Sequence, residues 1–246
     1  MFSYREYQEI IEIIKHSGKQ ATFKEAYTRE RYIIMRHDVE FSVERAYNLA
    51  RLENENHFNS TYFFQISNNS YNLLSKKNIN MVKEIHDMGH EVGLHFHLNG
   101  LEKEEDIVSE IKTELAIMNA KLNFKVDSFS IHRPSSVVLG YNIKLPGIIN
   151  AYQDEFFSYV EDMQTNVPEI KYLSDARHRW NYNLFPDEMT LNSNDKIQIL
   201  THPYTWTQEG YDNLNNFRTL FEEKKQEVLD TFDNECRHFG EVKNEL

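Results

Sequence analysis

The sequence predicts an α/β protein in which helices cover a parallel β-sheet, arranged either as a doubly wound sheet or as a (β/α) barrel. Short apolar stretches with strand character alternate with amphipathic stretches of helical length through the first half of the chain, which is the pattern of βαβ units. The length of 246 residues suits such a fold. Glycine-rich phosphate-binding motifs are absent after the first predicted strand, so nucleotide binding of those kinds has no support.

The first four predicted elements alternate between helix and strand. Residues 4–17 space their apolar positions as a helix does and are followed by a glycine, a typical helix end. The stretch RYIIMRHDVE, residues 31–40, predicts a buried strand that ends in charged residues. A helix follows over residues 42–56, with its first serine as the N-cap. NSTYFFQIS, residues 59–67, predicts the second strand.

The alternation continues to the middle of the chain. Residues 76–88 predict a helix that ends at a glycine, and EVGLHFH, residues 91–97, predicts the third strand. A long amphipathic helix is expected over 101–121, with acidic residues early in it. VDSFSIH, residues 126–132, predicts the fourth strand, and Pro134 breaks regular structure soon after it.

The later elements are shorter, apart from the last strand and helix. Three short strands are predicted at GIINAYQ (147–153), FFSYVED (156–162) and KYLSDA (171–176). KIQILTHPYTW, residues 196–206, predicts a further strand, and the charged segment that follows is helical in pattern.

No long linker interrupts the chain. We therefore expect residues 1–246 to form a single domain, with an N-terminal helix at about 4–17 and a C-terminal helical extension at about 208–246.

Composition narrows the classes of partner. Apolar residues make up 40% of the chain, which is enough for a packed core. The net charge of -12 opposes binding to nucleic acid. The N-terminus lacks a signal-peptide pattern, and no apolar run is long enough for a transmembrane segment, so a cytoplasmic location is expected. The single cysteine excludes an intrachain disulfide.

Charged residues gather where four predicted strands end, in RHDVE, HFH, IHRP and THP. The carboxyl ends of parallel strands meet at one edge of the sheet, where such proteins place their function. Asp38 and Glu40 share a face, as do His95 and His97, because side chains alternate along a strand. Each pair alone also fits an acidic helix cap or two structural histidines. Together they can form a site of two histidines and one carboxylate, which suits metal-assisted hydrolysis.

The order of RHDVE, STYFF, GHEVGLHFH, IHRP, SDARHRW and ILTHP, from about residue 31 to 206, resembles the polysaccharide deacetylases of carbohydrate esterase family 4. The first motif, of Arg-His-Asp-Val-Asp/Glu type, resembles that of a divergent branch. This resemblance implies a distorted (β/α) barrel of about seven parallel strands. It also implies a hydrolase, a metal-dependent deacetylase that removes an acetyl or other small acyl group from an N-acylated sugar in surface-polysaccharide or glycoconjugate biosynthesis.

The resemblance also implies roles for residues of the first two motifs. Asp38 takes the position of the catalytic base. The family's metal-binding aspartate falls on a valine, so Glu40 is its nearest replacement. His95 takes the position of the first metal-binding histidine. The second falls on an asparagine, and His97 is the available substitute. Either Asp38 or Glu40 is thus a candidate ligand.

The later motifs supply the other catalytic candidates. Arg133 matches an arginine that orients the catalytic aspartate. Asp175 resembles an acid that positions the catalytic histidine, and His202 matches that histidine, the general acid. Three aromatic residues are candidates for substrate binding by stacking on a sugar ring, with ordinary packing as the alternative: Trp180, Tyr204 and Trp206.

The ligand types fit a divalent metal, zinc by preference, with cobalt, nickel or iron also suited. Because two expected ligand positions are substituted, two alternatives stay open. One is a metal-independent amidohydrolase of the same fold, and the other is a non-catalytic protein that binds a glycan or a lipid carrier. The expected partner is a small-molecule or lipid-linked saccharide substrate. The sequence does not indicate an oligomeric state.

Overall fold

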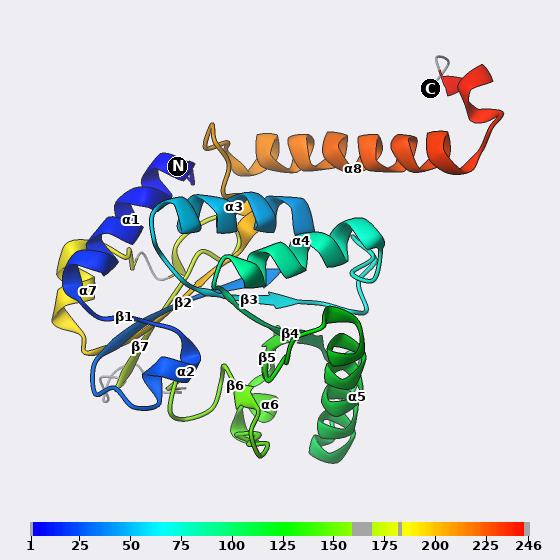
Figure 1. Cartoon of the computed structure of the whole chain (residues 1–246). Helices are drawn as coiled ribbons and strands as arrows, with labels where there is room; N and C mark the ends of the chain where they lie inside the picture. Colours follow the sequence, from blue (N-terminus) through cyan, green and yellow to red (C-terminus); the bar gives the residue numbers. More distant parts are fainter. Residues whose placement is uncertain (1, 159–168, 182–183, 244–246) are drawn as a thin grey trace.

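All strands of the structure, a computed structural model that describes residues 2–158, 169–181 and 184–243, belong to one parallel sheet. Seven strands follow the order β6-β5-β4-β3-β2-β8-β7, and β1 pairs with β2 (Figure 1). No pairing joins β6 to β7 among these residues, so the barrel is distorted and open between them. The strands are β1 (Gln20–Ala21), β2 (Tyr32–Val39), β3 (Thr61–Phe64), β4 (Glu91–His97), β5 (Ser128–His132), β6 (Ile149–Asn150), β7 (Ile170–Ser174) and β8 (Lys196–Thr201).

Helices connect the strands and cover the sheet (Figure 1). Serine N-caps begin several of them: the Ser42 side chain accepts a hydrogen bond from the Arg45 amide at the start of α3, which satisfies an otherwise unpaired donor. The helices are α1 (Tyr4–Ser17), α2 (Phe23–Ala26), α3 (Val43–Glu55), α4 (Lys76–Asp87), α5 (Glu104–Leu122), α6 (Ser136–Gly140), α7 (Glu188–Ser193) and α8 (Asn213–Glu235), with 3₁₀ turns η2 (Pro203–Thr205) and η3 (Phe239–Glu241). No helix within the described ranges is long and apolar enough to cross a membrane.

The two faces of the central strand β2 differ in chemistry. Ile33 and Met35 point outward and join α1 and α3 in an apolar cluster. Tyr32 and Ile34 belong to a different cluster, which includes Phe63 and fills the amino-terminal part of the interior. The next residues on that inner face, at positions 36 and 38, are charged. The interior is therefore apolar at its base and ionic at the carboxyl ends of the strands.

A glycine makes this internal packing possible. Gly93 lies on β4 beside Phe63, and a Cβ atom built at Gly93 would lie 2.4 Å from the Phe63 ring and 2.5 Å from Ser128 Oγ. Those contacts are too short for any side chain. Gly93, which precedes His95 by two residues on β4, therefore leaves room for the Phe63 ring in the interior of the barrel.

The predicted barrel of parallel strands is confirmed, and β1 adds one strand to the expected number. The predicted helix over 4–17 matches α1, and the predicted strand over 91–97 matches β4. The strand predicted over 156–162 is wrong for residues 156–158, which are not in a strand, and its remainder lies outside the described residues. The short elements β1, α2, α6 and α7 were not predicted, because so few residues give no periodic pattern.

Candidate active site

The inner face of β2 ends in a buried ion pair. Arg36 Nη2 lies 3.1 Å from Asp38 Oδ2, and both side chains are buried. Arg36 also donates to Gln198 Oε1 at 2.9 Å and to the Tyr152 hydroxyl at 2.7 Å. Burial alone would raise the pKa of Asp38, but the Arg36 guanidinium together with His95 and His202 outweighs it and holds this pKa below its ordinary value. Asp38 is thus an anion at neutral pH.

A hydrogen-bonded chain runs from Asp38 to His95 through one serine. The Ser130 hydroxyl donates to Asp38 Oδ1 at 3.1 Å, and His95 Nδ1 lies 2.8 Å from Ser130 Oγ. A hydroxyl has a single hydrogen, so Ser130 must accept from His95 when it donates to Asp38. His95 then carries its proton on Nδ1, which leaves Nε2 free to accept a hydrogen bond or bind a metal.

His95 Nε2 belongs to a group of three potential metal ligands. It lies 3.2 Å from His132 Nδ1, which lies 2.9 Å from Glu40 Oε1, and the third separation, from His95 to Glu40, is 3.9 Å. Bonds of about 2.0–2.2 Å to a tetrahedral ion would place ligand atoms roughly 3.4 Å apart. Glu40, His95 and His132 therefore fit a divalent metal such as zinc with little movement.

Glu40 is already held as an anion in this group. Burial would raise its pKa, but the hydrogen bond with His132 and the nearby imidazoles of His95 and His202 lower it well below its usual range. Glu40 can therefore act as a ligand without first losing a proton at neutral pH.

The position predicted for His97 is taken by His132. The two histidines are paired neighbours on β4 and β5, and their rings stack with centroids 4.9 Å apart. However, His97 Nδ1 accepts a hydrogen bond from the Asn99 amide at 3.0 Å, and His97 is not among the three convergent ligands. The loop after β4 thus turns His97 toward its own backbone, while His132 reaches Glu40.

His202 lies on the other side of Glu40, paired with a fully buried carboxylate. Asp175 Oδ1 is 2.6 Å from His202 Nδ1, and Asp175 also accepts from the His202 amide, the Thr205 hydroxyl and the Trp206 indole. These donors fix the carboxylate in place. His202 Nε2 is left facing the site, 3.9 Å from Glu40 Oε1.

The pKa of His202 reflects this pairing. Burial would lower it, but the negative charges of Asp175, Glu40 and Asp38 together raise it to about 9. His202 is therefore protonated at neutral pH. A buried, cationic imidazole beside Asp38 and Glu40 is an arrangement suited to proton donation.

Arg133 does not make its predicted contact. It is exposed, and no hydrogen bond or ion pair joins it to Asp38 in the part of the chain that the structure describes. Arg36 makes that contact from within the same strand. The prediction that Arg133 orients Asp38 is therefore wrong, because the turn after β5 carries Arg133 outward.

Two of the three aromatic candidates are core residues. Trp206 is fully buried, with edge contacts to Phe2 and Tyr7 at centroid distances of 5.0 and 4.9 Å. Trp180 is buried beside Trp206. Neither offers a ring face to a sugar, so the stacking prediction is wrong for Trp180 and Trp206.

Tyr204 is also buried, to 8% exposure like Trp180, but its ring lies beside that of His202. Its ring lies 6.0 Å from that of His202 and makes an edge contact with Phe41 at 4.7 Å. Phe217, from α8, lies 5.8 Å from Tyr204. Phe41, Tyr204 and Phe217 thus form an aromatic rim beside His202, and we refer to them as the aromatic rim.

The sequence contained a signal for some residues that the prediction missed. Arg36, Asp38 and Glu40 alternate along one strand, so Arg36 shares the inner face with the acids. His132 follows the same rule on β5 with Ser130. Tyr152 lies in an irregular segment after β6, and no pattern in the sequence indicates its contact with Arg36.

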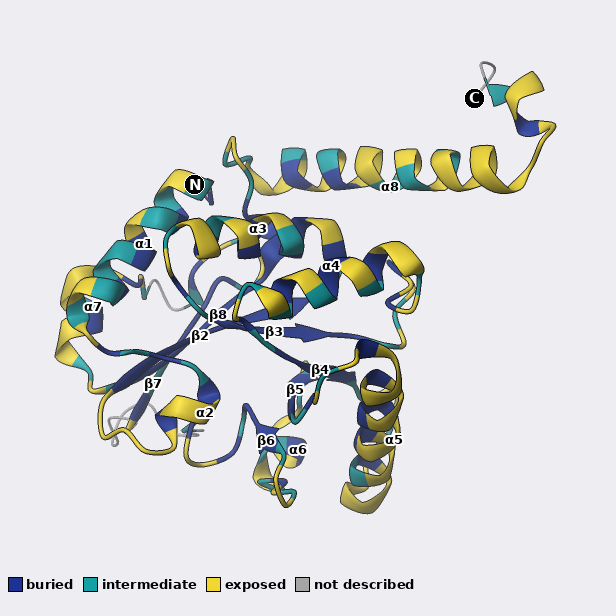
Figure 2. Cartoon of the chain, in the orientation of Figure 1, coloured by how far each residue is buried: buried dark blue, intermediate teal, exposed yellow. Residues whose placement is uncertain are grey.

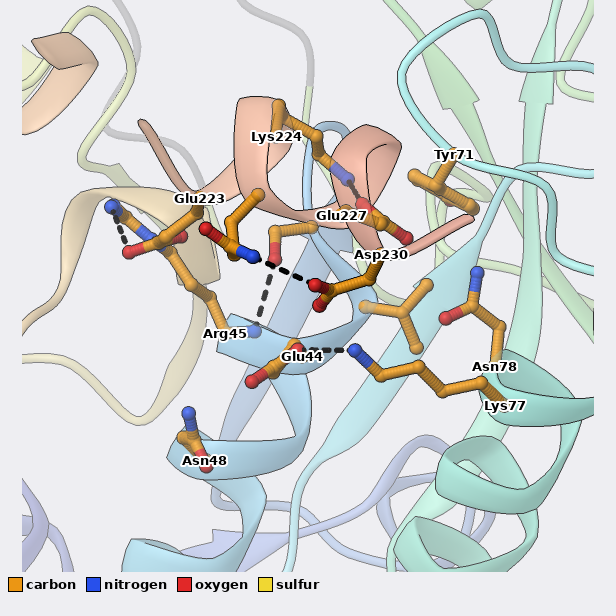
Figure 3. A pocket seen from close by; sticks show the side chains of 13 residues that line it. Glu44, Arg45, Asn48, Tyr71, Lys77, Asn78, Glu223, Lys224, Glu227 and Asp230 are labelled. Atoms are coloured by element: carbon orange, nitrogen blue, oxygen red, sulfur yellow. Dashed lines mark hydrogen bonds and ion pairs between the residues drawn. The ribbon is translucent and has the colours of Figure 1, made fainter. Parts of the chain in front are cut away.

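The surface recesses beside α3, α4 and α8 are not lined by Asp38, Glu40, His95, His132 or His202. A cavity of about 320 Å³ lies between α3, the start of α4, and α8 (Figure 3). Its walls include Arg45, Lys77, Glu227 and Asp230 but none of the predicted site residues. The convergence of side chains at the strand ends therefore defines the candidate site, rather than cavity size.

Comparison with known proteins found similar solved structures but no match by sequence. No family model matches the sequence, and no curated protein matches it. The structure is similar to a CE4 family pseudoenzyme from Bacillus anthracis, with 14% identity and a TM-score of 0.43 over 81% of this chain and 62% of that one.

Two further solved structures show the same level of similarity. One is the CE4 domain of a multidomain xylanase from the hindgut metagenome of Trinervitermes trinervoides (13% identity, TM-score 0.43, 82% and 85% of the two chains). The other is the chitin deacetylase of the fungal pathogen Colletotrichum lindemuthianum (16%, 0.43, 78% and 81%). The chain spans less than two thirds of the length of the Bacillus protein. The likeness concerns the fold.

Proposed function

We propose that the protein is a metal-dependent hydrolase that removes an acetyl or other small acyl group from the nitrogen of an amino sugar. One observation carries the proposal: Glu40 Oε1 lies 2.9 to 3.9 Å from nitrogen atoms of His132, His95 and His202. One carboxylate thus joins a pair of potential metal ligands to a cationic proton donor. Amide hydrolysis needs these groups together.

Glu40, His95 and His132 would hold the metal. A divalent ion bound there would supply a Lewis acid that polarises the acyl carbonyl and makes water a better nucleophile. Ser130 accepts a hydrogen bond from the Nδ1–H of His95, which leaves Nε2 of His95 available to the ion. The site favours zinc by its ligand types, and cobalt, nickel or iron would also suit them.

Asp38 and His202 would move the protons. Asp38, ionised by its pairing with Arg36, accepts a proton from the attacking water. His202, charged by its pairing with Asp175, donates a proton to the nitrogen of the departing amine. Because the pKa of Asp38 is lowered and that of His202 is raised, both groups are in the required state at neutral pH.

The substrate is proposed to be a small or lipid-linked saccharide in surface-polysaccharide or glycoconjugate biosynthesis. Tyr204, at the aromatic rim, would contact the sugar. The protein is proposed to act in the cytoplasm, where nucleotide sugars and the cytoplasmic ends of lipid-linked precursors are found.

Elemental analysis and an amine-release assay test this proposal together. Protein purified without chelator should contain about one divalent ion per chain and should release free amine from N-acetylated sugars. Asp38→Asn and His202→Ala should abolish release without removing the metal. Glu40→Gln should remove both. Protein that contains no metal after incubation with zinc, cobalt or nickel, or whose activity is unchanged in Asp38→Asn, would contradict the proposal.

A further inference from the structure

The C-terminal helix α8 carries apolar side chains that this copy of the chain does not cover. Figure 1 shows α8 running past the body of the molecule, and Figure 2 shows most of its surface as exposed. Within α8 only Asn216 and Leu220 are buried among the described residues. Five large apolar residues are exposed, by 61, 43, 69, 50 and 48%, and we call them the α8 stripe: Leu214, Phe217, Phe221, Val228 and Phe232.

The α8 stripe lies to one side of the face by which α8 attaches to its own body, and only Phe217, at its edge, also contacts Tyr204 and Phe41 of the same copy. Arg45 of α3 holds that face by hydrogen bonds to Asn216 at 2.7 Å and to Glu223 at 2.8 Å. Figure 3 shows the pair with Glu223. At 3.6 residues per turn, the stripe lies within an arc of about 60°, centred about 110° from Asn216 and Leu220. The stripe is therefore a second contact face.

The spacing of the stripe is symmetric. Phe217, Phe221, Val228 and Phe232 follow at intervals of four, seven and four residues. This sequence of intervals reads the same in both directions about the midpoint between residues 224 and 225. A two-fold axis there would place these four residues against one another, as an isologous interface requires, while Leu214 lies outside the symmetric set.

We infer that α8 pairs antiparallel with α8 of a second copy of this chain through the α8 stripe. In this arrangement Phe217 packs against Phe232 of the partner subunit. Phe221 packs in the same way against Val228 of the partner subunit. A contact through self-complementary apolar residues on facing helices is the ordinary basis of antiparallel helix pairing.

The aromatic residues of the stripe supply much of the area of such a contact. A fully buried aromatic side chain removes 150–250 Å² from solvent, so the exposed fractions of Phe217, Phe221 and Phe232 correspond to about 320 Å² per copy and about 640 Å² for the pair. Val228 and the flanking side chains of α8 would supply the rest of the ~1,000 Å² that a specific interface needs. An anionic membrane is a poorer partner, because α8 contains six acidic and three basic residues.

The inferred dimer would complete the border of the candidate site. Phe217 belongs to the aromatic rim, 5.8 Å from Tyr204 and 6.1 Å from Phe41. Phe232 of the partner subunit would lie against Phe217 and extend that rim. Each site would then be bordered by a residue of the other copy. This consequence depends on where the candidate site lies and not on the reaction that is proposed for it.

Light scattering after size exclusion tests the dimer directly. The full chain should have about twice its mass of 29.4 kDa at micromolar concentration. Phe221→Glu should give a monomer with an unchanged circular dichroism spectrum, since Phe221 is 69% exposed and removing it leaves the core intact. Gln226→Glu adds the same carboxylate on the opposite side of α8 and should remain dimeric. A monomeric wild type, including one that instead binds lipid vesicles, or a dimer that persists in Phe221→Glu, would overturn the inference.

Disulfide trapping tests the direction of pairing. In a Cys236→Ser background, a mixture of the Phe217→Cys and Phe232→Cys proteins should form a cross-linked dimer under oxidation. Phe217→Cys alone should not. Cross-linking of Phe217→Cys with itself would indicate parallel helices and would overturn the contribution of Phe232 to the partner's site. Neither readout depends on catalysis, so these experiments can fail while the proposed hydrolase activity holds, and the reverse.

Discussion

Arg36 Nη2 and Asp38 Oδ2 lie 3.1 Å apart on the inner face of β2, and both side chains are almost inaccessible to solvent. A buried pair of this kind repays its desolvation only through good geometry and further hydrogen bonds. Gln198 and Tyr152 supply these bonds to Arg36, and Ser130 supplies one to Asp38. The ion pair is therefore both a structural element of the barrel and the support of the proposed base.

Arg36→Leu is expected to lower the free energy of unfolding by about 3–5 kcal/mol, because it leaves the Asp38 charge buried without a cation. Arg133→Leu removes the arginine that the sequence favoured for this contact and, being exposed, should change stability by less than about 0.5 kcal/mol. Urea denaturation of both variants measures the difference. Equal losses from the two substitutions would show that Arg36 is not the partner of Asp38 in solution.

Metal binding distinguishes the two neighbouring histidines. His132→Ala should weaken binding of zinc or cobalt by more than the ~10–100-fold typical of losing an outer hydrogen-bond partner, because a ligand is lost. His97→Ala, which removes a ring that stacks on His132, should weaken it by less than about 10-fold. Titration calorimetry and the visible absorption of bound cobalt report both. A greater loss from His97→Ala would restore His97 as the ligand.

The sequence predicted the position of the site more accurately than its contacts. Parallel strands bring their carboxyl ends together whatever their loops do, so Asp38, His95 and His202 could be placed in one region from strand patterns alone. The choice between His97 and His132 depends on which ring turns inward. The loop after β4 decides this, because the Asn99 amide binds His97 Nδ1. No periodicity in the sequence records that bond.

The burial of Trp180 and Trp206 was also not predicted from the sequence. Trp206 follows the last strand, where side chains often border a site, but it turns into the core formed by α1 and the N-terminal residue Phe2. Its indole donates to Asp175 at 2.9 Å. Its connection to the site is thus indirect, by holding the carboxylate that orients His202. Such a long-range contact, between residues 2 and 206, has no local sequence signature.

Asp175→Asn is expected to change the protonation of His202. In metal-free protein the wild-type imidazole should titrate at about 9, because the negative charges of Asp175 and its neighbours outweigh burial. In Asp175→Asn the negative charge of Asp175 no longer raises the pKa of His202, while burial still lowers it. The pKa should therefore fall toward or below the ordinary value of 6.5. Nuclear magnetic resonance of the ring protons measures this.

Asp195→Asn, on the exposed carboxylate that pairs with Arg31, provides the control and should leave the titration of His202 unchanged. If the wild-type ring titrates near 6.5, the Asp175 pair does not hold its proton and His202 is a weaker general acid than proposed. In the active enzyme the donor would be lost as the pH rises through the pKa of His202.

A second buried carboxylate supports the barrel from outside the site. Glu53 of α3 accepts hydrogen bonds from the hydroxyls of Tyr7, Tyr62 and Ser60 at 2.6 to 2.7 Å, and His37 Nε2 lies 3.1 Å from it. His37 follows Arg36 on β2 and faces outward. The network therefore fixes α3 against the strand that carries Asp38.

Glu53→Gln should destabilise the protein at neutral pH, and the loss should depend on pH. Burial would raise the pKa of Glu53, but His37, with hydrogen bonds from its neighbours, lowers it from 4.5 to about 2. A lowered pKa adds stability that is present above pH 4.5 and is lost as the pH falls through 2. This lowering corresponds to about 3 kcal/mol.

Urea denaturation should show that difference between wild type and Glu53→Gln at pH 7, and a smaller one at pH 3. Glu55→Gln, an exposed change on the same helix, should cost less than about 0.5 kcal/mol at either pH. A wild type and Glu53→Gln variant that differ equally at pH 7 and pH 3 would show that the contribution of Glu53 is one of packing rather than charge.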